Sequence, residues 1–416
     1  MLGDASNYPH PVMSETNLLP EPKFLPELHP TYRPAILANR AFEQAARETG
    51  SAIDVGIALE QADGSVFHHR TVIFSADHGL AENNFRHVER LVKFLLWQRG
   101  GWKIHLSGAD NLVPELQEYY RTNTFGQFDD DVIGVRNNGH SIVVAGCAEL
   151  PAEQSEARLI GRNLNGCRIG FDLGGSDRKA AAVVDGEVKF SEEIAWDPYF
   201  EPDPNYHYEG IMDSLRRAAE HLPRVDAIGG SAAGCYSHNK VTWASLFRGV
   251  GPEDFDAHVR DIFTRIAAEW NVPLDVLNDG EVTALAGSMA LGRNGVLGIA
   301  MGTSEGGGYI DMDGNITTWL SELAFAPVDL HPEAPADEWS GDLGCGAQYF
   351  SQQAVGRLLA ASGIEYDASL KLPEQLEIVQ GFMEQGDERA LKIYDAIGIY
   401  LGYTLAHYAE FYDYEY

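Results

Sequence analysis

Positive charge is scarce in this sequence of 416 residues, where 30 lysines and arginines stand against 62 aspartates and glutamates, for a net charge of -32. A surface of this sign repels polyanions, so nucleic acid and anionic membranes are not expected partners. No segment reaches the ~18 consecutive apolar residues of a membrane-spanning helix. Residues 1–35 also lack the basic start and apolar run of a secretory signal. We therefore expect a cytoplasmic protein.

Cysteine is rare as well, and its spacing favours neither a disulfide framework nor a cysteine zinc site. His68 and His69 are adjacent, so on a strand they would point to opposite faces and could not easily share a metal ion. The acidic run at 128–132 is expected to be a solvated loop. The sequence has four cysteines, at Cys147, Cys167, Cys235 and Cys345.

The chain is longer than the ~250–300 residues at which single cores stop growing, so two or three domains are expected. Residues 1–35 are rich in proline and predict an extended arm. Residues 36–165 predict an accessory α/β domain of unknown role. Its pattern indicates strands at 52–60, 68–75, 102–108 and 140–146 and a helix at 83–98.

Two similar α/β halves follow, at 166–280 and 281–416. Each begins with a strand, a glycine-rich turn, a second strand and an Asp-Gly hairpin. Apolar spacing predicts one helix over 253–270 and a second in the C-terminal tail. The apolar stripe of the tail helix would contain Leu391, Tyr394, Ile397, Leu401, Leu405 and Tyr408. A half of this kind would normally bury that stripe against a further strand and helix, so we expect a truncated C-terminus.

The first candidate site is a glycine turn that follows a strand ending at Asp172. Its glycines allow backbone N–H groups to approach phosphate oxygens, and the carboxylate at the strand end could hold a hydrated magnesium ion. An ordinary hairpin turn is the alternative interpretation. The residues assigned to this nucleotide site are Asp172, Gly174, Gly175, Ser176 and Lys179.

A second turn, at residues 302–308, has two hydroxyl groups and four glycines between two strands. Ordering three successive glycines costs roughly 1 kcal/mol each relative to alanine, which favours a position where backbone must approach a ligand. The alternative is a turn without a ligand. The residues assigned here are Gly302, Thr303, Ser304, Gly306 and Gly307.

The third candidate is the pair Asn278-Asp279, which ends an apolar strand and starts a helix. Either residue would serve as an N-cap, and that is one interpretation. The other is that Asp279 faces a crevice at the carboxyl end of the strand and accepts a proton from a substrate hydroxyl, with Asn278 positioning that hydroxyl. The two interpretations are compatible.

These three segments, in this order and spacing, resemble the ROK family of sugar kinases and sugar-responsive repressors. The resemblance covers residues 167–412. It implies a two-lobed actin-like ATPase fold of the ribonuclease H-like class, preceded here by the extra α/β domain. By resemblance, the two glycine turns hold the phosphates of ATP, Asp279 is the catalytic base, and Asn278, Glu322 and Gly234 contact the sugar.

The sequence departs from the family pattern after Glu322. Where family enzymes have a histidine that binds a structural zinc ion, this chain has Phe325, and only Cys345 remains of the family's cysteine cluster. We therefore expect no structural zinc. The loss is consistent with hydrophobic support from Phe325, with a different sugar, or with binding without turnover.

The resemblance implies an ATP- and Mg²⁺-dependent kinase that phosphorylates a hydroxyl of a hexose or N-acetylhexosamine. The alternative is a catalytically inactive sugar sensor or scaffold. A DNA-binding repressor is disfavoured, because residues 36–165 predict strands where a helix-turn-helix would lie and the chain is acidic. The expected partners are a small-molecule sugar and a nucleotide. Because family members are often dimers or tetramers, the resemblance also implies a homo-oligomer.

Overall fold

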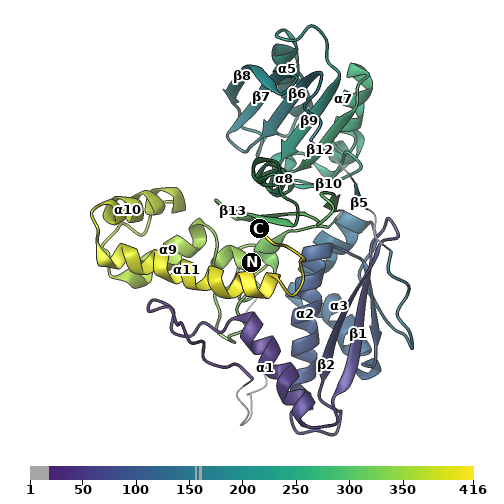
Figure 1. Ribbon diagram of the computed structural model, residues 1–416, viewed down its shortest axis with the longest axis vertical. Coiled ribbons are helices and arrows are strands. Elements are labelled where there is room, and N and C mark those ends of the chain that lie inside the picture. The colour runs from purple at the N-terminus through teal and green to yellow at the C-terminus, as the bar shows by residue number, and fades with distance from the viewer. Residues whose placement is uncertain (1–17, 155–156, 159–161, 318) are drawn as a thin grey trace. The chain divides into compact units, whose positions relative to one another are not determined.

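The structure is a computed structural model that describes residues 18–154, 157–158, 162–317 and 319–416 (Figure 1). Its described residues form two compact units. The first contains residues 18–154, 300–306 and 319–413, and the second contains residues 157–158, 162–299, 307–317 and 414–416. The four regions expected from the sequence, with boundaries after residues 35, 165 and 280, stay a prediction.

The first unit contains a four-stranded sheet in the order β2-β1-β3-β4. Strand β1 is antiparallel to β2 and β3, whereas β3 is parallel to β4. Helices α1, α2 and α3 contact this sheet. The strands and the long helix predicted in this region are confirmed within a few residues. The bounds are α1 Ala35–Glu48, β1 Ile53–Glu60, β2 Val66–Ile73, α2 Asn84–Arg99, β3 Lys103–Ser107, α3 Val113–Thr122, α4 Thr124–Asp129 and β4 Val143–Gly146.

Three C-terminal helices belong to the same unit: α9 (Gln352–Ser362), α10 (Leu372–Glu384) and α11 (Glu388–Tyr408). Helix α11 contacts α1, α9 and α10 (Figure 1). The predicted stripe on α11 was only partly right, because Leu391 and Leu405 are exposed. The buried face includes Ile393, Tyr400 and Tyr408. The apolar residues of this helix are frequent enough to fit more than one stripe, and packing selects among them.

The predicted arm at residues 1–35 lies partly outside the described residues. Its described part has no regular helix or strand before α1 and runs against α11. The ring of His29 and the hydroxyl of Tyr400 are 2.8 Å apart, and the N–H of Phe24 donates to the hydroxyl of Tyr403. These contacts tie the segment from residue 18 onward to the C-terminal helices.

The second unit is built on a five-stranded sheet in the order β12-β9-β6-β7-β8. Strands β6, β7 and β8 are antiparallel neighbours, whereas β9 and β12 run parallel to β6. This is the strand order of a ribonuclease H-like lobe, so the predicted α/β fold class is confirmed. The bounds are β6 Cys167–Leu173, β7 Asp177–Val184, β8 Glu187–Ala195, α5 Pro204–Ala219, β9 Ala227–Ala232, α7 Ile262–Trp270, β12 Leu274–Asn278 and α8 Asp279–Leu291.

Local chemistry explains the hairpin between β7 and β8. Asp185 and Gly186 have φ of 48° and 83°, and two successive residues with positive φ are what a tight turn between twisted antiparallel strands requires. The hairpin expected from the Asp-Gly pair is therefore present.

Two short strands, β10 (Cys235–Ser237) and β11 (Lys240–Trp243), form a separate ribbon.

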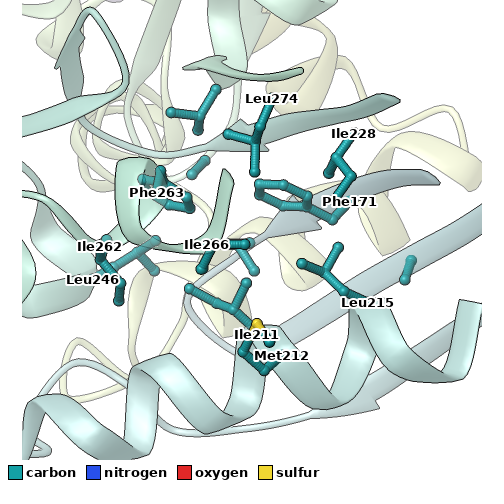
Figure 2. Close-up of a cluster of buried hydrophobic side chains, with 14 of the residues drawn as sticks. Phe171, Ile211, Met212, Leu215, Ile228, Leu246, Ile262, Phe263, Ile266 and Leu274 are labelled. Atoms are coloured by element: carbon teal, nitrogen blue, oxygen red, sulfur yellow. The ribbon is translucent and has the colours of Figure 1, made fainter. Parts of the chain in front are cut away.

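Helices α5 and α7 supply the core on one face of the five-stranded sheet (Figure 2). Phe171, Ile228 and Leu274 come from three of its strands and point toward Ile211 and Phe263 of the helices. The single helix predicted over 253–270 was wrong in its first half. That half consists of α6 (Pro252–Asp254) and a π-helical turn (Phe255–Val259) before α7 begins.

A second, smaller sheet has the order β13-β14-β15-β5. The division between the two compact units passes through β13 and β14. The bounds are β5 Ala157–Arg158, β13 Val296–Met301, β14 Glu305–Ile310 and β15 Ile316–Thr317. Within the described residues, no helix has the length and apolar character needed to cross a membrane.

Candidate active site

The first glycine turn joins β6 to β7 in the second unit. The N–H of Gly174 donates to the carbonyl of Asp177 at 2.9 Å, which closes the turn. The indole N–H of Trp196 donates to the carbonyl of Gly174 at 2.8 Å and fixes it from the side. Among the described residues, no hydrogen bond uses the N–H of Gly175 or Ser176. Two adjacent N–H groups are therefore available to an anion, as a phosphate-binding turn requires.

Gly175 is glycine for a steric reason. A Cβ at this position would lie 2.1 Å from the hydroxyl oxygen of Tyr199. The guanidinium of Arg248 lies 4.1 Å from the centroid of the Tyr199 ring and 4.5 Å from the centroid of the Phe200 ring. These aromatic rings hold a cation beside the glycine turn.

Arg248 is exposed and has no carboxylate partner among the described residues. This is unusual in a chain with a net charge of -32. Sequence reasoning missed Arg248 and Tyr199, because they follow the turn by more than 20 residues and belong to no recognisable motif. The isolated Arg248 within an acidic sequence was the only available signal.

Asp172 and Lys179 face each other across the β6–β7 pair, as their register shows. The Lys179 Nζ lies 3.0 Å from Asp177 Oδ1 and 3.7 Å from Asp172 Oδ2. The side chain of Asp172 is 43% exposed, so its charge is only partly neutralised by the protein. It could therefore hold a hydrated cation.

The pair Asn278-Asp279 adopts the capping geometry that one interpretation of the sequence required. Asn278 Oδ1 accepts from the N–H of Gly280, and Glu281 accepts from the N–H of Asn278, which completes a capping box. The Asn278 Nδ2 also donates to the carbonyl of Gly234 at 2.9 Å. Asn278 thereby links the end of β12 to the turn after β9, and the predicted sugar contacts Asn278 and Gly234 lie together.

Asp279 is the first residue of α8 and is exposed. Desolvation by the surrounding protein raises the pKa of its carboxyl, the N–H of Gly280 lowers it, and the negative charge of Asp172 raises it again. The two carboxylates are thus close enough to repel one another. Negative charge that the protein compensates only in part suits a magnesium ion with oxygen ligands. Within the described residues there is no cluster of three or more His, Cys, Asp or Glu side chains that could hold a metal by themselves.

Asp172, Lys179 and Asp279 line one cavity of about 1110 Å³ within the second unit. Gly170 and Asp172, which line the cavity, alternate along β6 with the core residue Phe171. The cavity therefore lies on the sheet face opposite that core, and residues of α8 also line it. Gly170 and Gly229 are paired across β6 and β9, and a Cβ at either would meet nothing within 4 Å. The floor of the cavity is therefore bare backbone at this pair.

The second glycine turn divides into two parts. Gly302, Thr303 and Ser304 are exposed in the first unit, and the N–H of Gly302 donates to the carbonyl of Ser304 at 3.0 Å. The carbonyl of Gly302 accepts from the N–H of Gln352, the first residue of α9. This exposed part retains the geometry of a hairpin turn. Gly306 follows within β14.

The glycines at the end of this stretch serve packing. In the second unit, a Cβ on Gly308 would lie 2.1 Å from the carbonyl oxygen of Gly280, and a Cβ on Gly280 would lie 2.2 Å from that of Gly307. The strand therefore presses its backbone onto the first turn of α8. The triple glycine has this structural reason in addition to the ligand approach that the sequence predicts for Gly307.

Glu322, the predicted sugar contact, lies in the first unit, where the backbone N–H of Glu322 donates to the carbonyl of Trp97 at 3.0 Å. Phe325 is buried and its ring centroid lies 4.4 Å from that of Trp97. The residues present do not fit the zinc ion that the resemblance would imply, because an aromatic cluster occupies the position of the histidine. Hydrophobic support by Phe325 is one of the expected explanations and agrees with this packing.

The expectation that residues 128–132 form a solvated loop was wrong. Asp129 ends α4 and is completely buried, with Lys93 Nζ at 2.8 Å from Asp129 Oδ1. The ion partner comes from a helix that is distant in sequence, so charge patterning alone could not reveal it. His68 and His69 have separate partners, the carbonyl of Pro151 and the ring of Phe411.

No protein-family profile and no curated protein sequence matches this chain. Solved structures do match it. A ROK family glucokinase from Streptomyces griseus, in complex with glucose and AMPPNP, has 22% identity and a TM-score of 0.45 over 60% of this chain and 80% of that one. The family that the motifs resemble is also the family of this structure.

Two further matches are of the same family. A ROK family transcriptional regulator, a homologue of the E. coli MLC protein, has 20% identity and a TM-score of 0.47 over 58% of this chain and 61% of that one. A ROK hexokinase from Thermus thermophilus has 19% identity and a TM-score of 0.42 over 55% of this chain and 72% of that one. Kinases and a regulator are thus both among the similar structures.

Proposed function

We propose that this protein is an ATP-dependent kinase that phosphorylates a hydroxyl of a hexose or an N-acetylhexosamine. The observation that carries the proposal is the position of Asp279 at the carboxyl end of β12, on the same cavity as Asp172, Gly174 and Lys179. Ligands of open α/β sheets bind at the carboxyl ends of the strands. The proposed partners are therefore a small-molecule sugar and a nucleotide.

Asp279 would act as the general base. Its carboxylate would accept the proton of the sugar hydroxyl as the oxygen of that hydroxyl bonds to the terminal phosphorus of ATP and the bond to ADP breaks. Its raised pKa brings the base closer to neutral pH, which improves the balance between being ionised and accepting a proton. Asn278 and Gly234 would orient the hydroxyl.

The first glycine turn would hold the phosphates without a basic surface. The N–H groups of Gly175 and Ser176, the ammonium of Lys179 and the guanidinium of Arg248 all lie at or beside this turn. Magnesium, when bound through water to Asp172, would neutralise the charge of the transferring phosphoryl group. Groups fixed before the reaction stabilise developing charge most effectively.

Residues of the first unit have their roles by resemblance. Glu322 would contact the sugar, and Gly302, Thr303, Ser304 and Gly306 would meet nucleotide phosphate. Their exposure or backbone fixation is compatible with these roles.

A non-catalytic sugar sensor is the second candidate, and the replacement at Phe325 favours it. The packing of Phe325 on Trp97 supports the loop without a metal, and such a loop could bind sugar without positioning it for transfer. A sensor of this kind would bind no DNA, because the acidic chain repels polyanions.

ADP release from ATP and Mg²⁺ across a panel of hexoses and N-acetylhexosamines distinguishes the two candidates. A kinase is expected to release ADP with one sugar or a few, and Asp279→Asn is expected to lose that turnover. Sugar binding by calorimetry without any ADP release would instead establish the sensor.

A further inference from the structure

The loop that begins at Ser321 is attached to the C-terminal end of α2. The last carbonyls of a helix have no partner within the helix and must find one elsewhere. In α2, the carbonyl of Gln98 accepts from the N–H of Ser321 at 2.9 Å, and the carbonyl of Trp97 accepts from the N–H of Glu322 at 3.0 Å. The end of α2 therefore fixes the backbone of Glu322.

This attachment holds a strained backbone. Ser321 is buried and has a φ of 50°, in the left-handed region that a residue with a Cβ seldom adopts. Such a conformation is energetically unfavourable and persists only where neighbouring groups impose it. Strained residues of this kind concentrate at ligand-binding positions, and Ser321 directly precedes the predicted sugar contact.

Lys93 connects α2 to the other segments around this loop. It is completely buried, and its Nζ lies 2.8 Å from Asp129 Oδ1 and 2.9 Å from Asp342 Oδ2. Burial opposes the charge of Lys93, but the two carboxylates outweigh it and raise the pKa of its ammonium. Arg90 forms a second ion pair with Asp342 at 3.0 Å. The segments before and after the Glu322 loop are thus tied to one helix.

Trp97 joins the charged and the aromatic parts of this arrangement. Its indole N–H donates to Asp129 Oδ1 at 2.9 Å, and its ring packs on Phe325. Phe128 and Trp339 complete the aromatic cluster, with ring centroids 5.6 Å from that of Phe325. A displacement of Trp97 would therefore disturb both the ion pairs and the turn that follows Glu322.

We propose that α2 is a positioning element for the sugar site, with Lys93 and Trp97 as positioning residues that act through Glu322. This inference rests on the proposed sugar contact of Glu322. It assigns a role to the N-terminal α/β region, namely support of the substrate loop, in place of a separate activity. Neither Lys93 nor Trp97 touches the substrate in this proposal.

The test is Lys93→Met, which leaves Asp129 and Asp342 buried without their shared cation. The KM for sugar is expected to rise about tenfold or more with the KM for ATP nearly unchanged, since small displacements of a positioned group have large effects. Lys93→Arg, which keeps a cation at this position, is expected to raise the KM for sugar less than Lys93→Met does. Phe263→Leu, in the core of the second unit, is the control for destabilisation alone. Equal changes in both KM values, or none, would overturn the proposal.

Trp97→Phe is a milder variant that keeps an aromatic ring but removes the hydrogen bond to Asp129, for use if Lys93→Met does not fold. Amide hydrogen exchange at Ser321 and Glu322 gives a readout independent of activity, and it is expected to accelerate in both variants. Unchanged exchange there would refute the positioning role. Glu322→Gln separates the two hypotheses: if it leaves sugar binding intact, the assigned role of Glu322 is wrong, whatever the exchange shows.

Discussion

Glu305 gives the sharpest prediction about stability. It is buried at the start of β14, where its Oε1 accepts a hydrogen bond from Tyr408 and its Oε2 has no partner among the described residues. Burial raises the pKa of this carboxyl from 4.5 to about 8, although the bond from Tyr408 lowers it. Sequence reasoning passed over Glu305 because it stands within the predicted phosphate-binding turn.

The sign of the pH dependence follows from this raised pKa. Between pH 4.5 and about 8 the folded protein holds a proton that the unfolded chain has released. The unfolded state therefore becomes more stable relative to the folded state as pH rises, so the free energy of unfolding falls. At about 1.4 kcal/mol per pH unit, the cost of keeping Glu305 neutral approaches about 4 kcal/mol at pH 8.

Glu305→Gln removes the titration and keeps nearly the shape of the neutral acid. The variant is expected to be more stable than the parent by a few kcal/mol at pH 8, with little difference near pH 4.5. Urea unfolding at both pH values, followed by circular dichroism, measures this. Glu384→Gln, at an exposed position of α10, controls for the change in net charge. The same gain at both pH values, or no gain at pH 8, would show that Glu305 does not hold its proton in the folded state.

Three further predictions concern the second unit. Asp279→Asn is expected to lower phosphoryl transfer by about 100-fold or more while sugar binding stays nearly unchanged, and an equal loss of both by calorimetry would contradict its role as base. Arg248→Met keeps the packing of the side-chain stem on Tyr199 but removes the cation. The value of kcat/KM for ATP should therefore fall by at least about tenfold with sugar affinity unaffected. A selective loss of sugar affinity would place Arg248 at the sugar instead. Gly308→Ala forces a Cβ to within 2.1 Å of the Gly280 carbonyl and should lower the free energy of unfolding by about 2 kcal/mol or more, measured with urea; an unchanged midpoint would mean that β14 and α8 separate without cost.

Local features of the site were within reach of the sequence. The turn at Gly174 closes with its own residues, and Asn278 caps the helix that begins one residue later. Such features depend on φ preferences and on hydrogen bonds between residues close together in the chain. For this reason the fold class of the second unit and the positions of Asp172 and Asp279 could be predicted.

Partners that are distant in sequence had no local signal. Asp129 appears in an acidic run that is typical of a solvated loop, yet Lys93 of α2 neutralises it in the interior of the first unit. The break in the helix predicted over 253–270 likewise has no signal in the sequence, because apolar spacing continues through the π-helical turn at Phe255–Val259. In both cases tertiary packing overrides a pattern that, taken alone, favours another structure.

The sequence by itself indicated the succession of strands and helices in the second unit, the two glycine turns and Asp279 as the candidate base. Each of these depends on residues within a few positions of one another. Only the tertiary structure decided that Arg248 stands beside the first glycine turn, that Gly308 is required by the backbone of α8, and that α2 carries the Glu322 loop. These are contacts between segments far apart in the chain. Their free energy comes from burial, steric fit and charge pairing, which exist only once the chain has folded.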